Sequence, residues 1–109
     1  WCDIRINIVM FVSNISFQVD PSIEFAWLNW VKQSFIPSCL NTACFVEHQL
    51  YQLDLAADQP PTFTLQLFSH TATQMAEFQE KHAETLLLSV TEQWGEQCFH
   101  FNTSMKIVN

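Results

Sequence analysis

The hydrophobic pattern of this chain changes its period at one point, the pair Asp20-Pro21. In residues 11–19 most apolar side chains stand at alternate positions, which is the period of a strand with one buried face. After the pair, apolar residues recur at the three- and four-residue spacing of an amphipathic helix, namely Ile23, Ala26, Trp27 and Trp30. Aspartate caps helices by accepting a hydrogen bond from an early amide, and proline suits the first helical position. The pattern therefore predicts a strand followed at once by a helix.

The middle of the chain returns to the alternating pattern. Pro37 is expected to end the first helix near Phe35, because proline cannot continue the helical hydrogen bonds. Residues 44–53 and 62–68 then alternate polar and apolar side chains, and both are predicted to be strands. The segment between them, residues 54–61, carries acidic residues and prolines and is predicted to be a loop.

A second helix and a last strand complete the predicted elements. Thr71 and Gln74 have the spacing of a capping box, in which the first side chain accepts a hydrogen bond from an amide of the new helix. A long helix is expected to follow and to end at Gly95, a residue suited to a left-handed C-cap. Residues 98–108 are predicted to form the fourth strand.

The predicted order, β-α-β-β-α-β, is that of the ferredoxin-like sandwich, an α+β fold with a four-stranded antiparallel sheet and two helices on one face. We expect residues 10–109 to form this single domain. Ile4, Ile6, Ile8 and Met10 stand at even positions, whereas from Ile15 onward the apolar positions are odd. One continuous strand cannot keep one face buried through that change without a bulge. Residues 1–9 are therefore predicted to be an N-terminal extension.

Charge composition limits the partners of the protein. Charged residues are 14% of the chain, below the roughly 25% of an average domain, which favours coverage of some surface by a second subunit. The net charge is −7, and the positive residues are Arg5, Lys32, Lys81 and Lys106. Four scattered cations cannot neutralise a run of phosphates, so neither nucleic acid nor an anionic membrane is an expected partner. No apolar run reaches the ~18–20 residues that span a bilayer, and no segment resembles a signal peptide, so a cytoplasmic location is predicted.

Cofactors and metals are not predicted either. A single glycine, Gly95, excludes the phosphate-cradling and dinucleotide-binding loops, which need several glycines. The histidines are His48, His70, His82 and His100. No two of them share a predicted element, whereas a metal site needs convergent ligands. The four cysteines form no Cys-x-x-Cys pair and are expected to be buried free thiols.

The sheet face opposite the helices must meet water, a partner or a ligand. Strand alternation predicts a polar patch on this face, and its candidate ligand-binding residues are Asn14, Ser16, Gln66, His100 and Asn102. Two interpretations stay open: a solvated face, common in antiparallel sheets, and a polar lumen between two sheets packed face to face in a dimeric α/β barrel. If the protein has a general base, His100 is the candidate. No catalytic residues can be assigned, because no sequence context marks an activated nucleophile.

Several segments together resemble one family of small bacterial domains, the domain-of-unknown-function family 4286. The segments are "VDPSIEFAWLNWVKQSFIPSCLNTACF", "TFTLQLF", "HAETL" and "WGEQCFHFNTSMKIVN". The resemblance covers residues 10–109. It implies a ferredoxin-like fold in a bacterial cytoplasmic protein with no assigned activity.

Three positions depart from the pattern of that family. Phe35 stands where a histidine is common, and Asn102 stands where a basic residue is common. Ala43 stands at the glycine of a turn that leads into a Cys-Phe pair. An activity that depends on the first two positions would be altered here, and the turn geometry is in question because glycine alone adopts positive φ freely.

Two functional hypotheses follow. The first is a homodimeric module without catalytic activity that binds a small ligand or another protein. The second is a small cofactor-independent enzyme, such as the monooxygenases and isomerases built on dimeric α/β barrels, and it rests on the fold alone. A closed polar chamber would favour a ligand, whereas a flat, open face would favour an interaction module.

Overall fold

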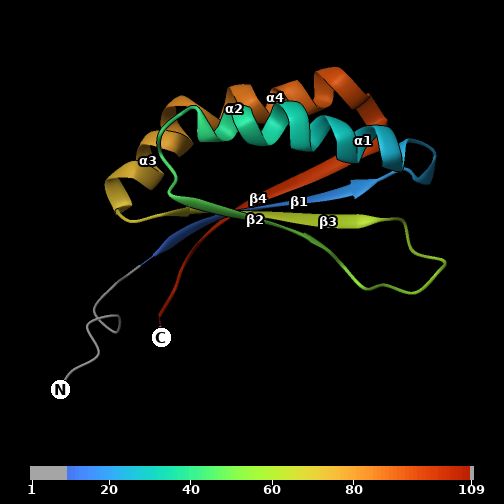
Figure 1. Ribbon diagram of the computed structural model, residues 1–109, viewed down its shortest axis with the longest axis horizontal. Coiled ribbons are helices and arrows are strands. Elements are labelled where there is room, and N and C mark those ends of the chain that lie inside the picture. The colour runs from blue at the N-terminus through green and yellow to red at the C-terminus, as the bar shows by residue number, and fades with distance from the viewer. Residues whose placement is uncertain (1–9, 109) are drawn as a thin grey trace.

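The computed structural model describes residues 10–108 and has the ferredoxin-like fold that the element order predicts. The strands are β1 (Phe11–Val19), β2 (Glu47–Gln52), β3 (Thr62–Ser69) and β4 (Cys98–Lys106). The helices are α1 (Glu24–Trp30), α2 (Ile36–Leu40), α3 (Ala72–Lys81) and α4 (Ala83–Trp94). All neighbouring strands are antiparallel in the order β2-β3-β1-β4, and the helices lie on one face of the sheet (Figure 1). The predicted extension at residues 1–9 lies outside the described residues.

The change of period at Asp20 is confirmed, because a helical segment begins directly after this residue. The Asp20 carboxylate accepts hydrogen bonds from the Ser22 amide at 2.9 Å and from the Ser22 hydroxyl at 2.8 Å. These bonds favour the ionised carboxyl, so the pKa of Asp20 lies below its ordinary value. Pro21 occupies the first position of a short 3₁₀ turn, Pro21–Ile23, that leads into α1.

The predicted helix end near Phe35 was wrong, because the helical path continues to the end of α2. A π-helical turn, Val31–Phe35, joins α1 to α2, and the Ile36 amide donates to the Val31 carbonyl five residues back. Pro37 follows in the first turn of α2. Proline lacks an amide hydrogen and clashes with the preceding turn of a regular helix, and a widened turn relieves both constraints.

Residues 72–94 form two helices, α3 and α4, where one long helix was predicted. Thr71 caps α3 as expected, since its hydroxyl accepts from the Gln74 amide at 3.0 Å, and Gly95 ends α4 with a positive φ of 57°. Between the two helices His82 leaves the helical region, with φ −125° and ψ −36°. Its amide still donates to the Phe78 carbonyl at 2.9 Å. The break lets α3 and α4 meet at an angle above the sheet (Figure 1).

Aromatic side chains fill the space between the sheet and the helical segment that runs from α1 to α2. The ring of Trp27, which is fully buried, lies 5.1 Å from the Phe17 ring and 4.8 Å from the Phe63 ring, measured between centroids. Phe35 adds an edge-on contact to Phe17 at 5.7 Å. Such rings bury large apolar areas and favour tilted contacts, so this cluster is the centre of the core.

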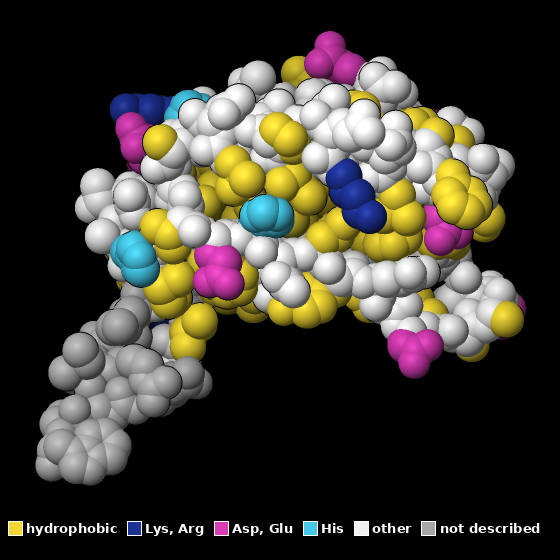
Figure 2. All heavy atoms as spheres, in the orientation of Figure 1, with side chains coloured by type: hydrophobic (Ala, Val, Ile, Leu, Met, Phe, Trp, Pro, Cys, Tyr) yellow, Lys and Arg dark blue, Asp and Glu magenta, His cyan; other side chains and the backbone are white. Residues whose placement is uncertain are grey.

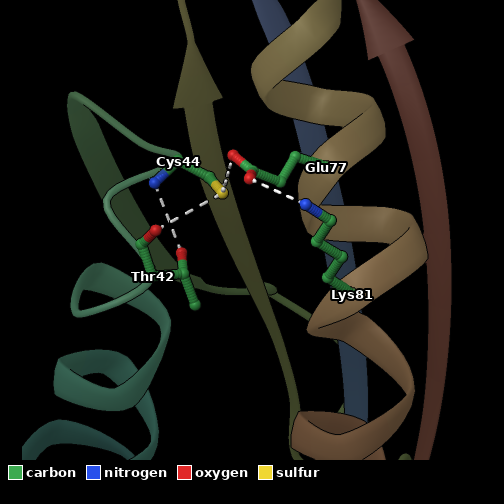
Figure 3. A network of polar contacts seen from close by, with 4 residues as sticks. All are labelled: Thr42, Cys44, Glu77 and Lys81. Carbon is green, nitrogen blue, oxygen red and sulfur yellow. Dashed lines mark hydrogen bonds and ion pairs between the residues drawn. The ribbon is translucent and has the colours of Figure 1, made fainter.

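The turn before β2 keeps the backbone of a glycine although it carries an alanine. Ala43 has φ 61°, and it is the one non-glycine residue with positive φ among residues 10–108. The turn is held by the Thr42 hydroxyl, which accepts from the Cys44 amide at 3.3 Å (Figure 3). It is also held by Ser69, whose hydroxyl donates to the Cys44 carbonyl at 2.7 Å. The missing glycine has therefore left the turn geometry in place at the cost of strain.

Replacing Ala43 by glycine should relieve this strain. A left-handed backbone costs a residue with a Cβ atom about 1 kcal/mol more than glycine. We expect Ala43→Gly to raise the free energy of unfolding by somewhat less than that, because glycine also gains freedom in the unfolded chain. Urea unfolding at one protein concentration measures the change. As a control, Ala76→Gly in the exposed face of α3 should lower stability by about 1 kcal/mol, and an equal loss for Ala43→Gly would contradict the prediction.

Candidate functional site

The strand register decides which side chains face the helices. Residues directly opposed in antiparallel strands point to the same side of a sheet. Ile15 is opposed by Leu65 on β3 and by Asn102 on β4, and Phe17 is likewise opposed by His100 on β4. Ile15 and Phe17 are buried beneath the helices. His100 and Asn102 therefore face the helices, and the prediction that they lie on the opposite face was wrong.

Hydrogen bonds confirm this placement. The Asn102 side chain accepts from the Ser13 hydroxyl at 3.1 Å and donates to the side-chain amide oxygen (Oε1) of Gln79 on α3 at 3.1 Å. Gln79 also donates to the Ser104 hydroxyl at 3.2 Å. The His100 Nε2 atom lies 3.4 Å from the Thr91 hydroxyl on α4. These hydrogen bonds connect β4 to α3 and α4, so the polar groups involved do not line the opposite face of the sheet.

The remaining candidates do lie on the sheet face without helices. This open face, as the register defines it, consists of Val12, Asn14, Ser16 and Gln18 from β1, Thr62, Thr64, Gln66 and Phe68 from β3, Glu47, Gln49 and Tyr51 from β2, and Phe99, Phe101, Thr103 and Met105 from β4. Within the described part of the chain no helix covers it (Figure 1). Asn14, Ser16 and Gln66 are thus brought together, whereas His100 and Asn102 are not.

The open face has a polar centre and an apolar border. At the centre the Gln66 amide donates to the Asn14 side chain at 3.4 Å, and the Ser16 and Thr64 hydroxyls lie 3.4 Å apart. At the β4 edge Phe99, Phe101 and Met105 expose 58%, 66% and 40% of their surfaces, and Tyr51 at the β2 edge exposes 46%. Sequence reasoning missed the β4 part of this border because alternating aromatic residues normally mark the buried side of a strand.

The chemistry available on the open face is hydrogen bonding without charge. Among its described residues only Glu47 and Tyr51 are titratable, and both stand on the edge strand β2. The amides and hydroxyls at the centre can donate and accept hydrogen bonds but cannot transfer a proton at neutral pH. The arrangement can therefore hold an uncharged polar molecule more readily than it can perform acid–base catalysis.

Other polar clusters in the described residues are small. Figure 3 shows the Cys44 thiol 3.9 Å from the Glu77 carboxylate, which pairs with Lys81 at 3.4 Å on the surface of α3. Within residues 10–108 no group of three histidine, cysteine or acidic side chains could hold a metal ion. On the side of the molecule seen in Figure 2 the few basic side chains stand apart, so they form no anion-binding patch there. None of the described helices has the length and apolar character that crossing a bilayer requires.

Comparison with known proteins supports the fold and one family. A family model described as "Domain of unknown function (DUF4286)" matches residues 10–108. No curated protein is similar enough in sequence to match the chain.

Solved structures with the same fold share little sequence with the chain. A dimeric ferredoxin-like protein from an uncultured marine organism has a TM-score of 0.61 and 7% identity, over 93% of this chain and 97% of that chain. A putative antibiotic biosynthesis monooxygenase from Nitrosomonas europaea has a TM-score of 0.58 and 15% identity, over 90% of this chain and 88% of that one. An ethyl tert-butyl ether d (ethd) family protein from Bacillus halodurans has a TM-score of 0.62 and 6% identity, over 85% of this chain and 96% of that one. At these identities the likeness shows the fold alone.

The pKa values of two buried cysteines predict how the stability of the protein depends on pH. Burial raises the pKa of the Cys39 thiol to about 12 and that of Cys98 to about 11, from an ordinary value of 9.0, because an apolar environment disfavours the thiolate. Above the ordinary pKa the unfolded thiols ionise while the folded thiols stay protonated. The free energy of unfolding should therefore fall as the pH rises above 9.0.

Urea unfolding under reducing conditions, on both sides of that pH, measures this effect. The matched control is a Cys39→Ala/Cys98→Ala variant, which retains the lysines and tyrosine that also titrate at alkaline pH. Its stability should fall less than that of the wild type over the same pH interval. An equal fall in the two proteins would show that the buried thiols are not responsible.

Proposed function

The chain belongs to the DUF4286 family, a domain of unknown function, and we propose that it is a homodimer whose two open faces enclose a chamber for a small uncharged ligand. The observation that carries this proposal is the composition of the open face, whose polar centre is bordered by exposed aromatic side chains. The dimeric state of one protein with the same fold is consistent with it. A bacterial cytoplasmic location stays a prediction.

The border of the open face argues for a protein partner. Phe99 and Phe101 expose more than half of their surfaces on one edge strand, next to Met105. Contiguous exposed apolar groups are uncommon on monomers and mark interaction sites. Aromatic side chains and methionine are also enriched in interfaces. The low share of charged residues in the whole chain, 14%, fits a surface that is partly covered.

The centre of the open face argues for the kind of ligand. Asn14, Ser16, Thr64 and Gln66 are half-buried and offer amide and hydroxyl groups. Convergent uncharged donors and acceptors recognise polar groups of small molecules without requiring an opposite charge. A hollow of about 210 Å³ at the end of the sheet beyond these residues has Asp20 and Glu96 in its lining. Two carboxylates in a hollow that also borders the open face at Gln18 and Phe99 disfavour an anionic ligand.

Binding is favoured over the enzymatic alternative. The candidate base, His100, faces α4 and contacts Thr91 on the far side of the sheet from Asn14 and Gln66. A general base must reach the proton that it removes, either directly or through one water molecule. A cofactor-independent monooxygenase or isomerase would have to obtain its reactivity from the ligand itself, because the centre of the open face supplies no acid or base.

Disrupting the apolar border should separate the subunits. We expect the wild type to sediment as a dimer and Phe101→Asp to sediment as a monomer, because the substitution would place a carboxylate in a desolvated interface. Leu88→Asp is the matched control, since Leu88 on α4 exposes 55% of its surface but lies on the helical side. A monomeric wild type, or dissociation only by the control, would contradict the dimer.

Removing amide groups from the chamber should release the ligand. Protein purified from a bacterial host under mild conditions is expected to carry a small molecule that native mass spectrometry detects as added mass on the dimer. Asn14→Leu/Gln66→Leu should remain dimeric and lose that mass, because leucine leaves the polar groups of the ligand unpaired. Equal retention of the molecule by the variant would place its binding site elsewhere.

A further inference from the structure

We propose that the two-fold axis of this dimer runs along the strands, so that β2 of one protomer lies over β4 of its partner and Tyr51 meets the partner's Phe101. This inference rests on the dimer proposed above and adds its geometry. It follows from the way in which the register orders the open face into rows across the sheet.

Each row crosses the four strands in the order β2, β3, β1, β4. The first three rows are Glu47-Phe68-Val12-Met105, Gln49-Gln66-Asn14-Thr103 and Tyr51-Thr64-Ser16-Phe101. The fourth row ends on Thr62, Gln18 and Phe99, and Leu53 begins it because its amide donates to the Thr62 carbonyl at 2.9 Å. The two central residues of a row are therefore apolar in the first row, at one end of the face, and polar in the rows that follow.

A two-fold axis between facing sheets can take two simple directions. An axis along the strands keeps each row opposite itself and reverses the order of the strands, so that β3 faces β1 of the partner and β2 faces β4. An axis across the strands keeps each strand opposite itself and reverses the order of the rows. Every contact in such a dimer occurs twice, because the interface is isologous.

The axis along the strands brings similar groups together. In the first row the half-buried Phe68 lies over the partner's Val12, and this apolar contact is small because Val12 is only 4% exposed. In the second row the Gln66 amide meets the amide of the partner's Asn14. In the third row the Thr64 hydroxyl meets the hydroxyl of the partner's Ser16. In the fourth row Thr62 faces the partner's Gln18, so the two central residues of all four rows face groups of similar polarity.

The other axis brings unlike groups together. Reversing the rows would place Phe68 over the partner's Thr62, and Val12 over the partner's Gln18. Apolar groups would then desolvate polar ones without offering them hydrogen bonds, which costs free energy. The contrast between the two directions is what selects the axis along the strands.

The edges of the sheet agree with this choice. Tyr51 would pack on the partner's Phe101, and Leu53, which exposes 41% of its surface, on the partner's Phe99. The two pairs would form a seam along each side of the dimer and cover the edge strands, whose exposed edges otherwise invite aggregation.

The chamber would then be built from both protomers. Asn14 and Ser16 of one sheet would face Gln66 and Thr64 of the other, so that a ligand between them would contact two copies of each residue. Closely packed sheets lie roughly 10 Å apart with their side chains interdigitated, so the chamber requires the two polar centres to stand further apart than that. Each sheet alone supplies only one wall, so the binding site is incomplete in a monomer.

Thiol crosslinking between matched positions tests the axis. Gln49→Cys and Thr103→Cys are made separately in a chain with Cys2→Ser, in which the three remaining cysteines are buried. The two variants are unfolded, mixed, refolded and treated with a short bismaleimide. We expect a covalent dimer in the mixture and none in either variant alone, because these positions belong to one row on opposite edges. Tyr51→Cys with Phe101→Cys repeats the test in the neighbouring row.

The outcomes separate the axis from the dimer itself. A covalent dimer from Thr103→Cys alone, with sedimentation still showing a dimer, would overturn the axis and leave the proposed function standing. A monomer in sedimentation would overturn both. Leu88→Cys mixed with Gln49→Cys is the control and should give no covalent dimer, because Leu88 is exposed on the helical side. Crosslinking of the control as efficiently as of the matched pair would also overturn the inference.

Discussion

The pairing of β1 with both of its neighbours is the constraint on which the rest of the structure depends. Because β1 is central, its register sets the facing of β3 and β4 together. Placing Phe17 opposite Phe63 and His100 sends all three toward the helices. The intervening residues, among them Ser16, are then directed to the open face. A shift of one position would exchange the two faces completely.

The way in which the helices pack depends on the side chains that the sheet directs toward them. Phe17 and Phe63 offer large rings, and Trp27 from α1 packs between them as the centre of the core. Toward α3 the sheet instead presents the buried Ser13 and the exposed Asn102, which both hydrogen-bond to Gln79. The bonds that Ser13 makes to Asn102 and Gln79 satisfy a hydroxyl that would otherwise be buried without a partner. One face of the sheet therefore holds two kinds of contact, apolar beneath α1 and polar beneath α3.

Local chemistry made much of the fold predictable from sequence. The caps at Asp20 and Thr71 and the helix end at Gly95 each depend on a few neighbouring residues, and all three are confirmed in position. Gly95 has φ 57° but ψ −132°, so the predicted left-handed C-cap conformation was wrong. The continuation of the first helix past Pro37 was not predictable, because it depends on a π-helical turn that no residue pattern marks. The break at His82 likewise reflects how two helices fit one twisted sheet.

The prediction of which β4 side chains face the helices was wrong for a reason that concerns function. Its alternation puts Phe99 and Phe101 on one side and His100 and Asn102 on the other, and burial within one chain would favour turning the aromatic side inward. The structure turns it outward, toward the open face. Three of the five predicted site residues, Asn14, Ser16 and Gln66, therefore lie on the predicted face. His100 and Asn102 were misplaced because the aromatic residues of β4 are suited to a partner surface and not to the core of one chain.

Hydroxyl-radical footprinting at several protein concentrations would test most directly whether the open face is covered in solution. Aromatic side chains react readily when exposed, and Phe25, which exposes 91% of its surface on α1, provides an internal reference. The account predicts that Tyr51, Phe99 and Phe101 become protected as the concentration rises through the dimerisation range, while Phe25 keeps its reactivity. Protection of Phe25 together with unchanged reactivity of Phe101 would contradict it.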